Sequence, residues 1–432
     1  MKHSSLIGHV VEALTLVFAG RRPADAVIGE FFRARHYLGS SDRRFISEVS
    51  YGVIRHHRLI AARSQRALGR PGGAPVEAVV LVAARESTGP DADPDAIASS
   101  IGELWSVREI GCAEFARRVK SAAEDESALP LAVRYSIPDF VAAEWEQRFP
   151  PEEAEALCAA SNAQPPIALR VNTLKGDAAS CAGALLREGI ETSAGGISPL
   201  ALVLPRRINT LSLQSFRSGL FEMQDEGSQL VAPLLEARPG MAVLDACAGG
   251  GGKSLHLAAI MENRGEIIAL DVEGARLESL RVRARRAGAT IVRSTLLRSD
   301  SPSPVADRYH AVLIDAPCSG TGTFRRNPWM KLTCTRDFSR SLAGRQREIL
   351  RRYAPSVKRG GRLVYATCTL LEEENREVVK DFLASRPDFT LLSAADVLAR
   401  QGIRVPADGP WLELFPHRSG TDGYFAAVMV RG

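Results

Sequence analysis

Two cysteines in this 432-residue chain follow strand-like segments and begin polar loops. Cys318 lies in the motif DAPCSGTG, after the apolar run 311–316, and Cys368 lies in YATCTLLEEEN, after the run 362–367. One cysteine alone is usually a small buried apolar residue, but two thiols at neighbouring strand ends favour covalent chemistry. A thiolate that adds to carbon 6 of a pyrimidine makes carbon 5 nucleophilic enough to accept a methyl group, and a second thiol can assist product release. These residues alone leave open which thiol attacks.

A glycine-rich segment supplies a second candidate site. The motif DACAGGGGKS, residues 245–254, lies between a strand-like run and a helical pattern. Glycines let a ligand approach the backbone closely, and a helix start offers free N–H groups. Asp271 ends the next strand-like run, where a carboxylate can accept hydrogen bonds from both ribose hydroxyls of a nucleoside cofactor. The loop lacks the GxGxxG pattern of dinucleotide sites and starts with Asp245, which favours the cationic S-adenosylmethionine over a nicotinamide cofactor.

The elements that must position these residues alternate between strand and helix from about residue 216 onward. Apolar strand-like runs occur at 241–246, 266–271, 311–316 and 362–367, and helical patterns occur at 274–288 and 339–358. This alternation predicts a doubly wound, mostly parallel sheet in an α/β domain. Ligands of such sheets bind beyond the carboxyl ends of the strands. Asp315 ends the third run, where its carboxylate can stabilise a proton on a pyrimidine ring nitrogen.

Two other segments precede the expected catalytic domain at 216–432. Residues 1–130 read as all-helical, with apolar residues at helical spacing in 6–19 and again in 42–59. Residues 131–215 predict a small α+β unit, with a helix at 140–149, a strand in 167–175 and a helix at 178–188. A division into three segments agrees with the chain length, since domains average about 150 residues.

Composition narrows the setting of the protein. The seven cysteines form no CxxC pair, which argues against structural zinc and disulfides and favours a cytoplasmic protein without metal. No apolar run reaches the length of about 18 residues that a membrane span requires. The net charge is +5, and 48 of the 55 basic residues are Arg. Arg suits phosphate and guanine edges, so the composition permits a nucleic-acid partner without requiring one.

The motifs in their order resemble those of the RNA 5-methylcytosine methyltransferases. The resemblance rests on FEMQDEGSQL at 221–230, RRNPWMK at 325–331 and the three motifs that contain Asp245, Cys318 and Cys368. RVNTLK, residues 170–175, resembles the RNA-binding segment that precedes this domain in the family. Residues 41–58 resemble the NusB-like helical domain of the bacterial RsmB-type members, which act on small-subunit ribosomal RNA. The resemblance implies a Rossmann-like, S-adenosylmethionine-dependent domain that is preceded by a NusB-like domain.

The family pattern assigns a role to each motif residue. It makes Cys368 the nucleophile and Cys318 the residue that assists release, and it places Asp315 between cofactor and cytosine. Asp271 would hold the ribose, and Thr295 stands where the family usually has an acidic residue near the adenine. The loop residues that would line the methionine part of the cofactor are Cys247, Ala248, Gly249, Gly250, Gly251, Gly252 and Lys253.

This chain departs from the family in the cofactor loop. The family usually reads Ala-Pro-Gly-Gly-Lys there, whereas this chain has four consecutive glycines before Lys253. The missing proline leaves the free loop more mobile, at a cost of up to about 1 kcal/mol. We therefore expect a weakened but retained affinity for the cofactor.

The expected partner is ribosomal RNA, bound by a monomer. Arg325, Arg326 and Lys331 follow Cys318 and are candidates for phosphate contacts. A base that must reach a cysteine has to be unstacked, which favours a hairpin loop as the target. Two alternatives are the same reaction on transfer RNA and a non-catalytic RNA-binding assembly factor that kept the fold. A nicotinamide-dependent oxidoreductase would leave both cysteines unexplained.

Overall fold

The computed structural model describes residues 3–20, 22–69, 79–80, 110–122, 126–298, 305–406 and 409–432. Contacts between residues divide the chain into two compact units. The first unit comprises Met1–Ala163 and Phe324–Thr335, and the second comprises Gln164–Thr323 and Arg336–Gly432. The chain therefore enters the second unit, returns to the first for twelve residues and leaves it again.

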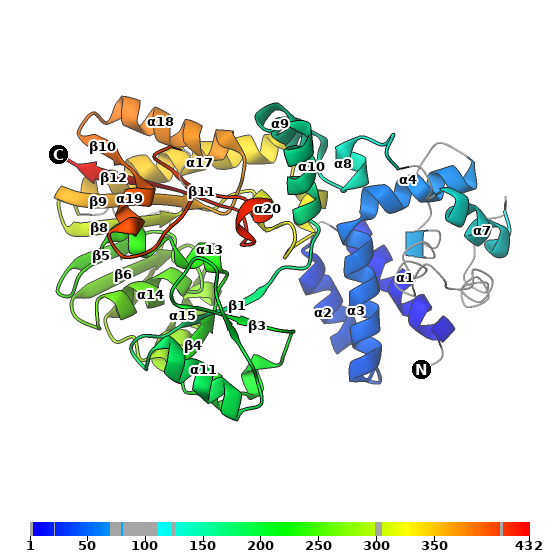
Figure 1. Cartoon of the computed structure of the whole chain (residues 1–432), viewed down its shortest axis with the longest axis horizontal. Coiled ribbons are helices and arrows are strands. Elements are labelled where there is room, and N and C mark those ends of the chain that lie inside the picture. The colour runs from blue at the N-terminus through cyan, green and yellow to red at the C-terminus, as the bar shows by residue number, and fades with distance from the viewer. Residues whose placement is uncertain are drawn as a thin grey trace. The chain divides into compact units, whose positions relative to one another are not determined.

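The first unit is helical throughout its described part (Figure 1). Its helices are α1 (His3–Ala19), α2 (Ala24–Arg33), α3 (Ser40–Arg55), α4 (His57–Leu68), α7 (Cys112–Ala122), α8 (Leu131–Arg134), α9 (Asp139–Arg148), α10 (Pro151–Ala160) and α16 (Met330–Thr333). Apolar faces of these helices enclose a core in which Leu14, Ile54, Phe115 and Trp329 are at most 7% exposed. The helix expected over 42–59 is divided at His56, whose backbone (φ −112°, ψ 23°) leaves the helical range.

A small antiparallel sheet begins the second unit. Its strands lie in the order β2 (Ser193–Ala194), β3 (Ala201–Leu204), β1 (Ile167–Val171) and β4 (Phe221–Met223). Helix α11 (Ala178–Arg187) packs against this sheet through Cys181 and Leu185, and α12 (Gln214–Arg217) follows. The α+β character expected of this region is confirmed. Residues 131–160, expected in the same segment, instead group with the helical unit.

The larger sheet carries the strand–helix alternation that the sequence predicted. Its strands are β5 (Ala242–Asp245), β6 (Glu266–Asp271), β7 (Val292–Leu296), β8 (Tyr309–Asp315), β9 (Val357–Thr367), β10 (Phe389–Leu392), β11 (Leu412–Leu414) and β12 (Tyr424–Arg431). The order is β10-β12-β9-β8-β5-β6-β7, with β11 paired to β12. Pairs from β9 to β7 are parallel, and β12 pairs antiparallel with β9. The fold is the expected doubly wound, mostly parallel one.

Helices cover both faces of this sheet (Figure 1). On one face, α14 (Gly252–Ile260), α15 (Gly274–Ala287) and α19 (Ala394–Ala399) contribute to one apolar core. On the other, α17 (Arg336–Tyr353) and α18 (Arg376–Ser385) contribute to a second core. Two short helices, α13 (Glu226–Gln229) and α20 (Pro416–Ser419), also belong to this domain. Burial of both faces explains the continuous apolar strand runs in the sequence.

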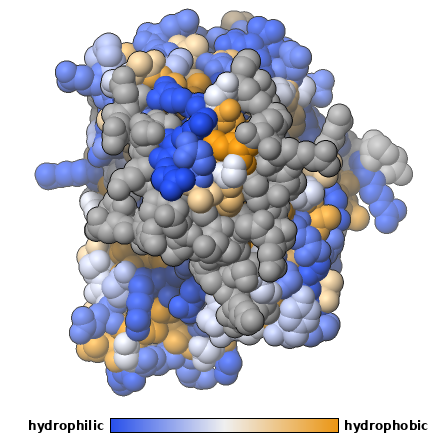
Figure 2. Space-filling model, turned by 90° about the vertical axis from the view of Figure 1, so that its right-hand side faces the viewer, coloured by the Kyte–Doolittle hydropathy of each residue, from blue (hydrophilic) through white to orange (hydrophobic). Residues whose placement is uncertain are grey.

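The described helices include none that is both long enough and apolar enough to cross a bilayer. Figure 2 shows one face of the molecule coloured by hydropathy. Among the coloured atoms on that face, hydrophilic residues predominate and apolar residues form small patches rather than a continuous band.

Candidate active site

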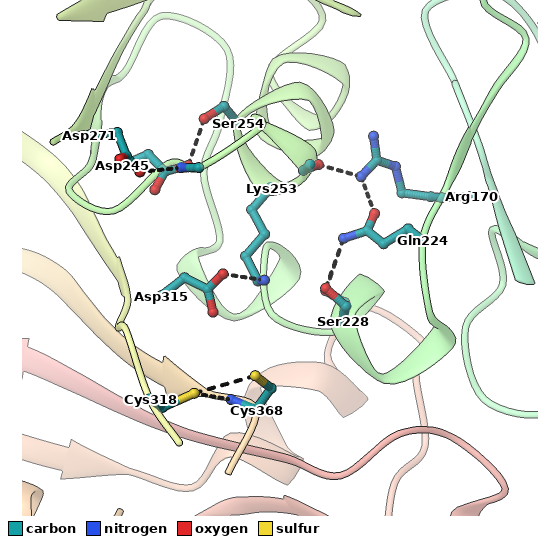
Figure 3. Close-up of polar contacts among 12 residues, drawn as sticks. Arg170, Gln224, Ser228, Asp245, Lys253, Ser254, Asp271, Asp315, Cys318 and Cys368 are labelled. Atoms are coloured by element: carbon teal, nitrogen blue, oxygen red, sulfur yellow. Dashed lines mark hydrogen bonds and ion pairs between the residues drawn. The ribbon is translucent and has the colours of Figure 1, made fainter. Parts of the chain in front are cut away.

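The candidate site lies where four parallel strands end. Asp245 ends β5, Asp271 ends β6, Asp315 ends β8 and Thr367 ends β9, with Cys368 immediately after it. Because parallel strands share a direction, their carboxyl ends lie along one edge of the sheet. Figure 3 shows the three aspartates, Lys253 and both cysteines gathered at this edge.

The glycine loop makes a tight turn between β5 and α14. Gly249 and Gly251 have positive φ angles of 54° and 84°, which glycine adopts at little cost. A Cβ atom on Gly251 would lie 2.6 Å from Cγ of Leu280, so side chains are also excluded there by α15. The N–H of Gly251 donates to the carbonyl of Ala248 at 2.9 Å, which closes the turn. Helix α14 then begins at Gly252 and directs its free N–H groups toward the loop.

Asp271 is held by the backbone on both of its oxygens. The N–H of Gly249 donates to Oδ2 and the N–H of Glu273 donates to Oδ1, each at 2.8 Å. The side chain is fixed at the mouth of the loop, and each oxygen retains a lone pair for a ribose hydroxyl. Thr295, expected near the adenine, is exposed in the edge strand β7, where it pairs with Leu270 of β6.

Asp245 keeps one oxygen without a protein partner. Its Oδ2 accepts a hydrogen bond from Ser254 Oγ at 2.6 Å, whereas its Oδ1 has no hydrogen-bond partner among the described residues. The carboxyl is 1% exposed, and burial raises its pKa to about 7. A buried unpartnered acceptor at a strand end fits a ligand that carries hydrogen-bond donors. This observation and the glycine turn agree with an amino-acid-bearing nucleoside as occupant.

Lys253, which is buried, and Asp315, which is partly exposed, form an ion pair near the cysteines (Figure 3). Lys253 Nζ lies 2.5 Å from Asp315 Oδ2 and 5.8 Å from the ring centre of Tyr424. Burial alone would lower the pKa of Lys253, but the carboxylate of Asp315 outweighs burial and raises that pKa. Asp315 Oδ2 is thus oriented by the lysine.

The two cysteine sulfurs are in contact without a disulfide bond. Their Sγ atoms are 3.3 Å apart, and the backbone N–H of Cys368 points to Cys318 Sγ at the same distance. The hydrogen bond to Cys368, together with burial, raises the pKa of Cys318 well above its usual value. Cys318 therefore holds its thiol proton firmly, and its Sγ lies within hydrogen-bond distance of Cys368 Sγ.

Comparison with known sequences places this arrangement in a family. The sequence profile described as "16S rRNA methyltransferase RsmB/F" matches residues 232–430, and the profile of the family's ferredoxin-like domain matches residues 137–210. The probable ribosomal RNA small subunit methyltransferase B of Synechocystis is 31% identical, over 92% of this chain and 93% of its own length. The protein of the same description from Bacillus subtilis is 36% identical, over 76% and 72% respectively. The chain belongs to the RsmB/F family.

Solved structures resemble this RsmB/F protein over much of its length. The crystal structure of PH0851 aligns with a TM-score of 0.76 and 25% identity, and the alignment covers 100% of this chain and 99% of that one. A methyltransferase homologue from Pyrococcus horikoshii aligns with a TM-score of 0.60 and 26% identity, over 71% of this chain and 100% of its own. Both agree with the Rossmann-like methyltransferase fold.

Glu374 is a buried site residue that the sequence analysis did not single out. Its Oε2 accepts from the backbone N–H of Ser319 and from Gln346 Nε2, both at 2.9 Å, and its Oε1 accepts from Ser339 Oγ at 2.9 Å. Gln346 Nε2 also donates to the carbonyl of Pro317 at 2.9 Å. One carboxylate therefore ties the loop of Cys318 to α17, and it lies six residues beyond Cys368. Its place in the motif YATCTLLEEEN was the available signal.

The expected RNA-contacting residues belong to a different unit from the cysteines. Arg325, Arg326 and Lys331 all lie in the helical unit. Arg326 is exposed, whereas Arg325 and Lys331 are each 4% exposed. Lys331 Nζ lies 3.3 Å from the carbonyls of Arg55 and Tyr135 and also donates to the side chain of Asn162. In this conformation Lys331 stabilises the helical unit and is not accessible to a phosphate.

Among the residues that the structure describes, no group of three or more His, Cys, Asp or Glu is arranged to hold a metal ion.

Proposed function

We propose that this RsmB/F protein methylates carbon 5 of cytosine in small-subunit ribosomal RNA, with S-adenosylmethionine as methyl donor. The observation that carries the proposal is the contact between Cys318 and Cys368, 3.3 Å apart beside the Lys253–Asp315 pair. Covalent activation of a pyrimidine needs a thiolate, a second group for product release and a carboxylate near the ring. Family membership supplies the substrate class and the reaction.

The two thiols take different roles in this proposal. Cys368 Sγ adds to carbon 6 of the cytosine, which converts carbon 5 into a nucleophile. Asp315 lies at the same strand edge, where its carboxyl group stabilises a proton on ring nitrogen 3. Bound S-adenosylmethionine supplies an electrophilic methyl group. After methylation, carbon 5 loses its proton and the bond between Cys368 and carbon 6 breaks.

Formation of the adduct changes the acidity of Cys318. In the free protein, the hydrogen bond to Cys368, together with burial, holds the pKa of Cys318 high. Once Cys368 Sγ is bonded to carbon 6, the interaction between the two thiols is lost, and the Cys318 thiol can give up its proton to solvent. The resulting Cys318 thiolate accepts the carbon 5 proton that must leave, which returns Cys318 to its thiol form. This sequence supports Cys368 as nucleophile and Cys318 as the residue of product release.

Each part of S-adenosylmethionine has a candidate partner among the residues at the strand ends. Asp271 would hold the ribose hydroxyls, and the loop Cys247–Lys253 would surround the methionine portion. Asp245 Oδ1 is an unpartnered acceptor suited to the amino group, and Thr295 is our candidate for the adenine side. The RNA target would be an unpaired base in a hairpin loop, and we propose a cytoplasmic monomer that uses Arg326 among its phosphate contacts.

Variants of the two cysteines test the reaction directly. The purified protein is incubated with small-subunit ribosomal RNA and S-adenosylmethionine, and new 5-methylcytosine is located by bisulfite sequencing. Cys368→Ala should abolish turnover and form no covalent RNA complex. Cys318→Ala should accumulate that complex as a denaturation-resistant band, because the carbon 5 proton is not removed. Cys112→Ala, in the helical unit, is the matched control and should keep full turnover.

Three outcomes would contradict the proposal. An adduct that accumulates in Cys368→Ala but not in Cys318→Ala would reverse the two roles. Methylation of transfer RNA alone would refute the ribosomal substrate. Failure of the wild-type protein to bind S-adenosylhomocysteine in a calorimeter would refute the cofactor.

A further inference from the structure

Two arginines donate hydrogen bonds to carbonyl groups of the glycine loop. Arg283 Nη1 donates to the carbonyl of Gly250 at 2.6 Å. Arg170 Nη1 donates to the carbonyl of Gly252 at the same distance (Figure 3). These two carbonyls flank Gly251, the residue with the largest positive φ of the turn. Since a peptide unit is planar, a fixed carbonyl also fixes the direction of the N–H that follows it.

Polar networks orient both arginines. Arg283 donates to Glu222 at 3.0 and 3.1 Å, and Arg286 forms an ion pair with the other oxygen of Glu222. Arg170 is 2% exposed, and its guanidinium also donates to Gln224, which in turn donates to Ser228 Oγ at 3.1 Å. These contacts restrain the guanidinium groups independently of the glycine loop. The arginine side chains therefore lose less rotamer freedom when they bind the loop carbonyls.

The arginine contacts fall where this loop most needs restraint. Four successive glycines, Gly249–Gly252, give the free segment more backbone freedom than any other residue type would. In this chain Gly250 stands at the place of the family's proline, and its carbonyl is the one that Arg283 binds. Hydrogen bonds from a charged donor are among the stronger ones, so they offset part of that freedom.

Arg170 comes from a part of the chain that was expected to bind RNA. It lies in β1 of the small sheet, in the segment RVNTLK. Asn172, in the same segment, donates to the carbonyls of Gly219 and Ala287 at 2.8 Å, so it too is turned toward the catalytic domain. The polar side chains of this segment therefore connect the small sheet with the elements around the cofactor loop.

We propose that Arg170 and Arg283 are positioning residues that preorganise the glycine loop for the methyl donor, in place of the missing proline. The proposal rests on the proposed function, since it presumes that the loop binds S-adenosylmethionine. It adds that affinity for the donor depends on the small antiparallel sheet, which supplies Arg170. Neither arginine touches the reacting atoms.

Calorimetry with S-adenosylhomocysteine tests the proposal on the full chain without any turnover. Arg283→Met keeps the side-chain stem but removes the donors, and we expect its Kd to rise about tenfold, equivalent to ~1.4 kcal/mol. Arg281→Met is the matched control, because Arg281 lies on the same helix but pairs with Glu278 and Ser294 rather than with Glu222 or a loop carbonyl. We expect its Kd to change less than twofold. In steady-state assays, Arg283→Met should raise KM for the donor and leave kcat and KM for RNA near wild type.

A second substitution separates preorganisation from damage to the fold. Gly250→Pro in the Arg283→Met background stiffens the loop by another route, and we expect it to restore at least half of the lost affinity in logarithmic terms. Equal Kd values for Arg283→Met and Arg281→Met, or no recovery with Gly250→Pro, would overturn this proposal. The proposed function would still stand if the wild-type protein bound S-adenosylhomocysteine. Wild-type protein that bound no S-adenosylhomocysteine would overturn the proposed function and this proposal with it.

Discussion

At the scale of single residues, three carboxylates at one sheet edge differ in how they are satisfied. Asp271 receives two backbone N–H groups, Asp315 is paired with Lys253, and Asp245 receives one hydroxyl and keeps an unpartnered oxygen. The first two therefore have side chains whose orientation is fixed by hydrogen-bond donors. Asp245 is the carboxylate whose charge is least compensated, and burial raises its pKa to about 7.

The raised pKa of Asp245 predicts a pH dependence of stability. In the unfolded chain this carboxyl titrates near 3.8, so between about pH 4 and 7 the folded state holds more protons. Asp245 should therefore make its full contribution to the free energy of unfolding below pH 4. That contribution should decrease as the pH rises through 7. A tenfold difference in proton affinity between the two states corresponds to about 1.4 kcal/mol. The charges that face the group are those of Asp315, which raises its pKa, and Lys253, which lowers it.

Urea unfolding between pH 4 and 8 measures this dependence. Asp245→Asn should lose much of the slope, because the amide does not titrate and still accepts from Ser254. Asp381→Asn, in α18 with a half-exposed side chain paired to Arg347, is the control and should keep the wild-type slope. Identical slopes for the wild type and Asp245→Asn would contradict the argument.

The position of a candidate site residue was predictable where its motif lies at a strand end. Cys318, Cys368 and Asp271 follow from short sequence patterns, because a strand brings its last residue to a defined edge. Glu374 and Arg170 were not predictable as site residues, since their roles arise from partners that are distant in the chain: Arg170 meets Gly252 across 82 residues. The contacts of Lys331, which we expected to bind RNA phosphate, were also not predictable from the sequence. Its partners Arg55, Tyr135 and Asn162 all lie at least 169 residues earlier in the chain.

At the scale of elements, the loop after β8 and the loop before β12 hold the backbone at Cys368 in place through hydrogen bonds. The N–H of Gly322 donates to the carbonyl of Cys368 at 3.0 Å, and the N–H of Gly423 donates to the carbonyl of Gly322 at 2.8 Å. A Cβ on Gly322 would overlap the Gly423 carbonyl oxygen and lie 2.8 Å from that of Cys368. The contact between the loop after β8 and the loop before β12 therefore requires glycine.

A pair of glycine substitutions tests this contact. Gly322→Ala should lower the free energy of unfolding by about 1–3 kcal/mol, because backbone atoms must move apart, and should reduce methylation by displacing Cys368. Gly344→Ala, on the exposed side of α17 with open space around it, should instead raise stability by up to about 1 kcal/mol. Chemical unfolding and the methylation assay together measure both effects. An unchanged Gly322→Ala protein would show that the loops have room to shift.

The elements themselves were largely predictable, and the differences have local causes. The expected strand 266–271 is β6, and the expected helices 178–188 and 274–288 are α11 and α15, each one residue shorter. The helix expected to run to Lys358 ends at Tyr353, because Pro355 cannot continue a helix. Strand β9 starts at Val357, earlier than its apolar core at 362–367, because pairing with β8 extends it through polar residues.

At the scale of the whole molecule, the helical unit is completed by residues from the second half of the chain. The segment 324–335 supplies Trp329, which is 7% exposed in the helical core, and Lys331, which binds oxygens of Arg55, Tyr135 and Asn162. The chain passes between the two units three times as a result. Neither the three-segment division of the sequence nor composition indicated this return.

Fragments of the chain test this dependence. A fragment of residues 1–163 should unfold at a lower temperature than the same fragment joined through a flexible linker to residues 324–335. The expected difference corresponds to about 3–5 kcal/mol, the usual cost of losing a buried Trp. Circular dichroism during heating measures it. A fusion that carries Trp329→Ala and Lys331→Ala is the control and should melt like the short fragment; equal melting of all three would refute the dependence.

The returning segment also sets an order for synthesis. A ribosome completes residue 163 before it begins the 160 residues that precede Phe324. At about 5–20 residues per second, that interval lasts roughly 8–30 seconds. Throughout it, the place of Trp329 in the helical core is unfilled and the backbone carbonyls of Arg55 and Tyr135 lack their ammonium partner. The first unit to emerge is thus finished only after more than half of the second unit has been made, and until then the nascent chain must protect an incomplete core.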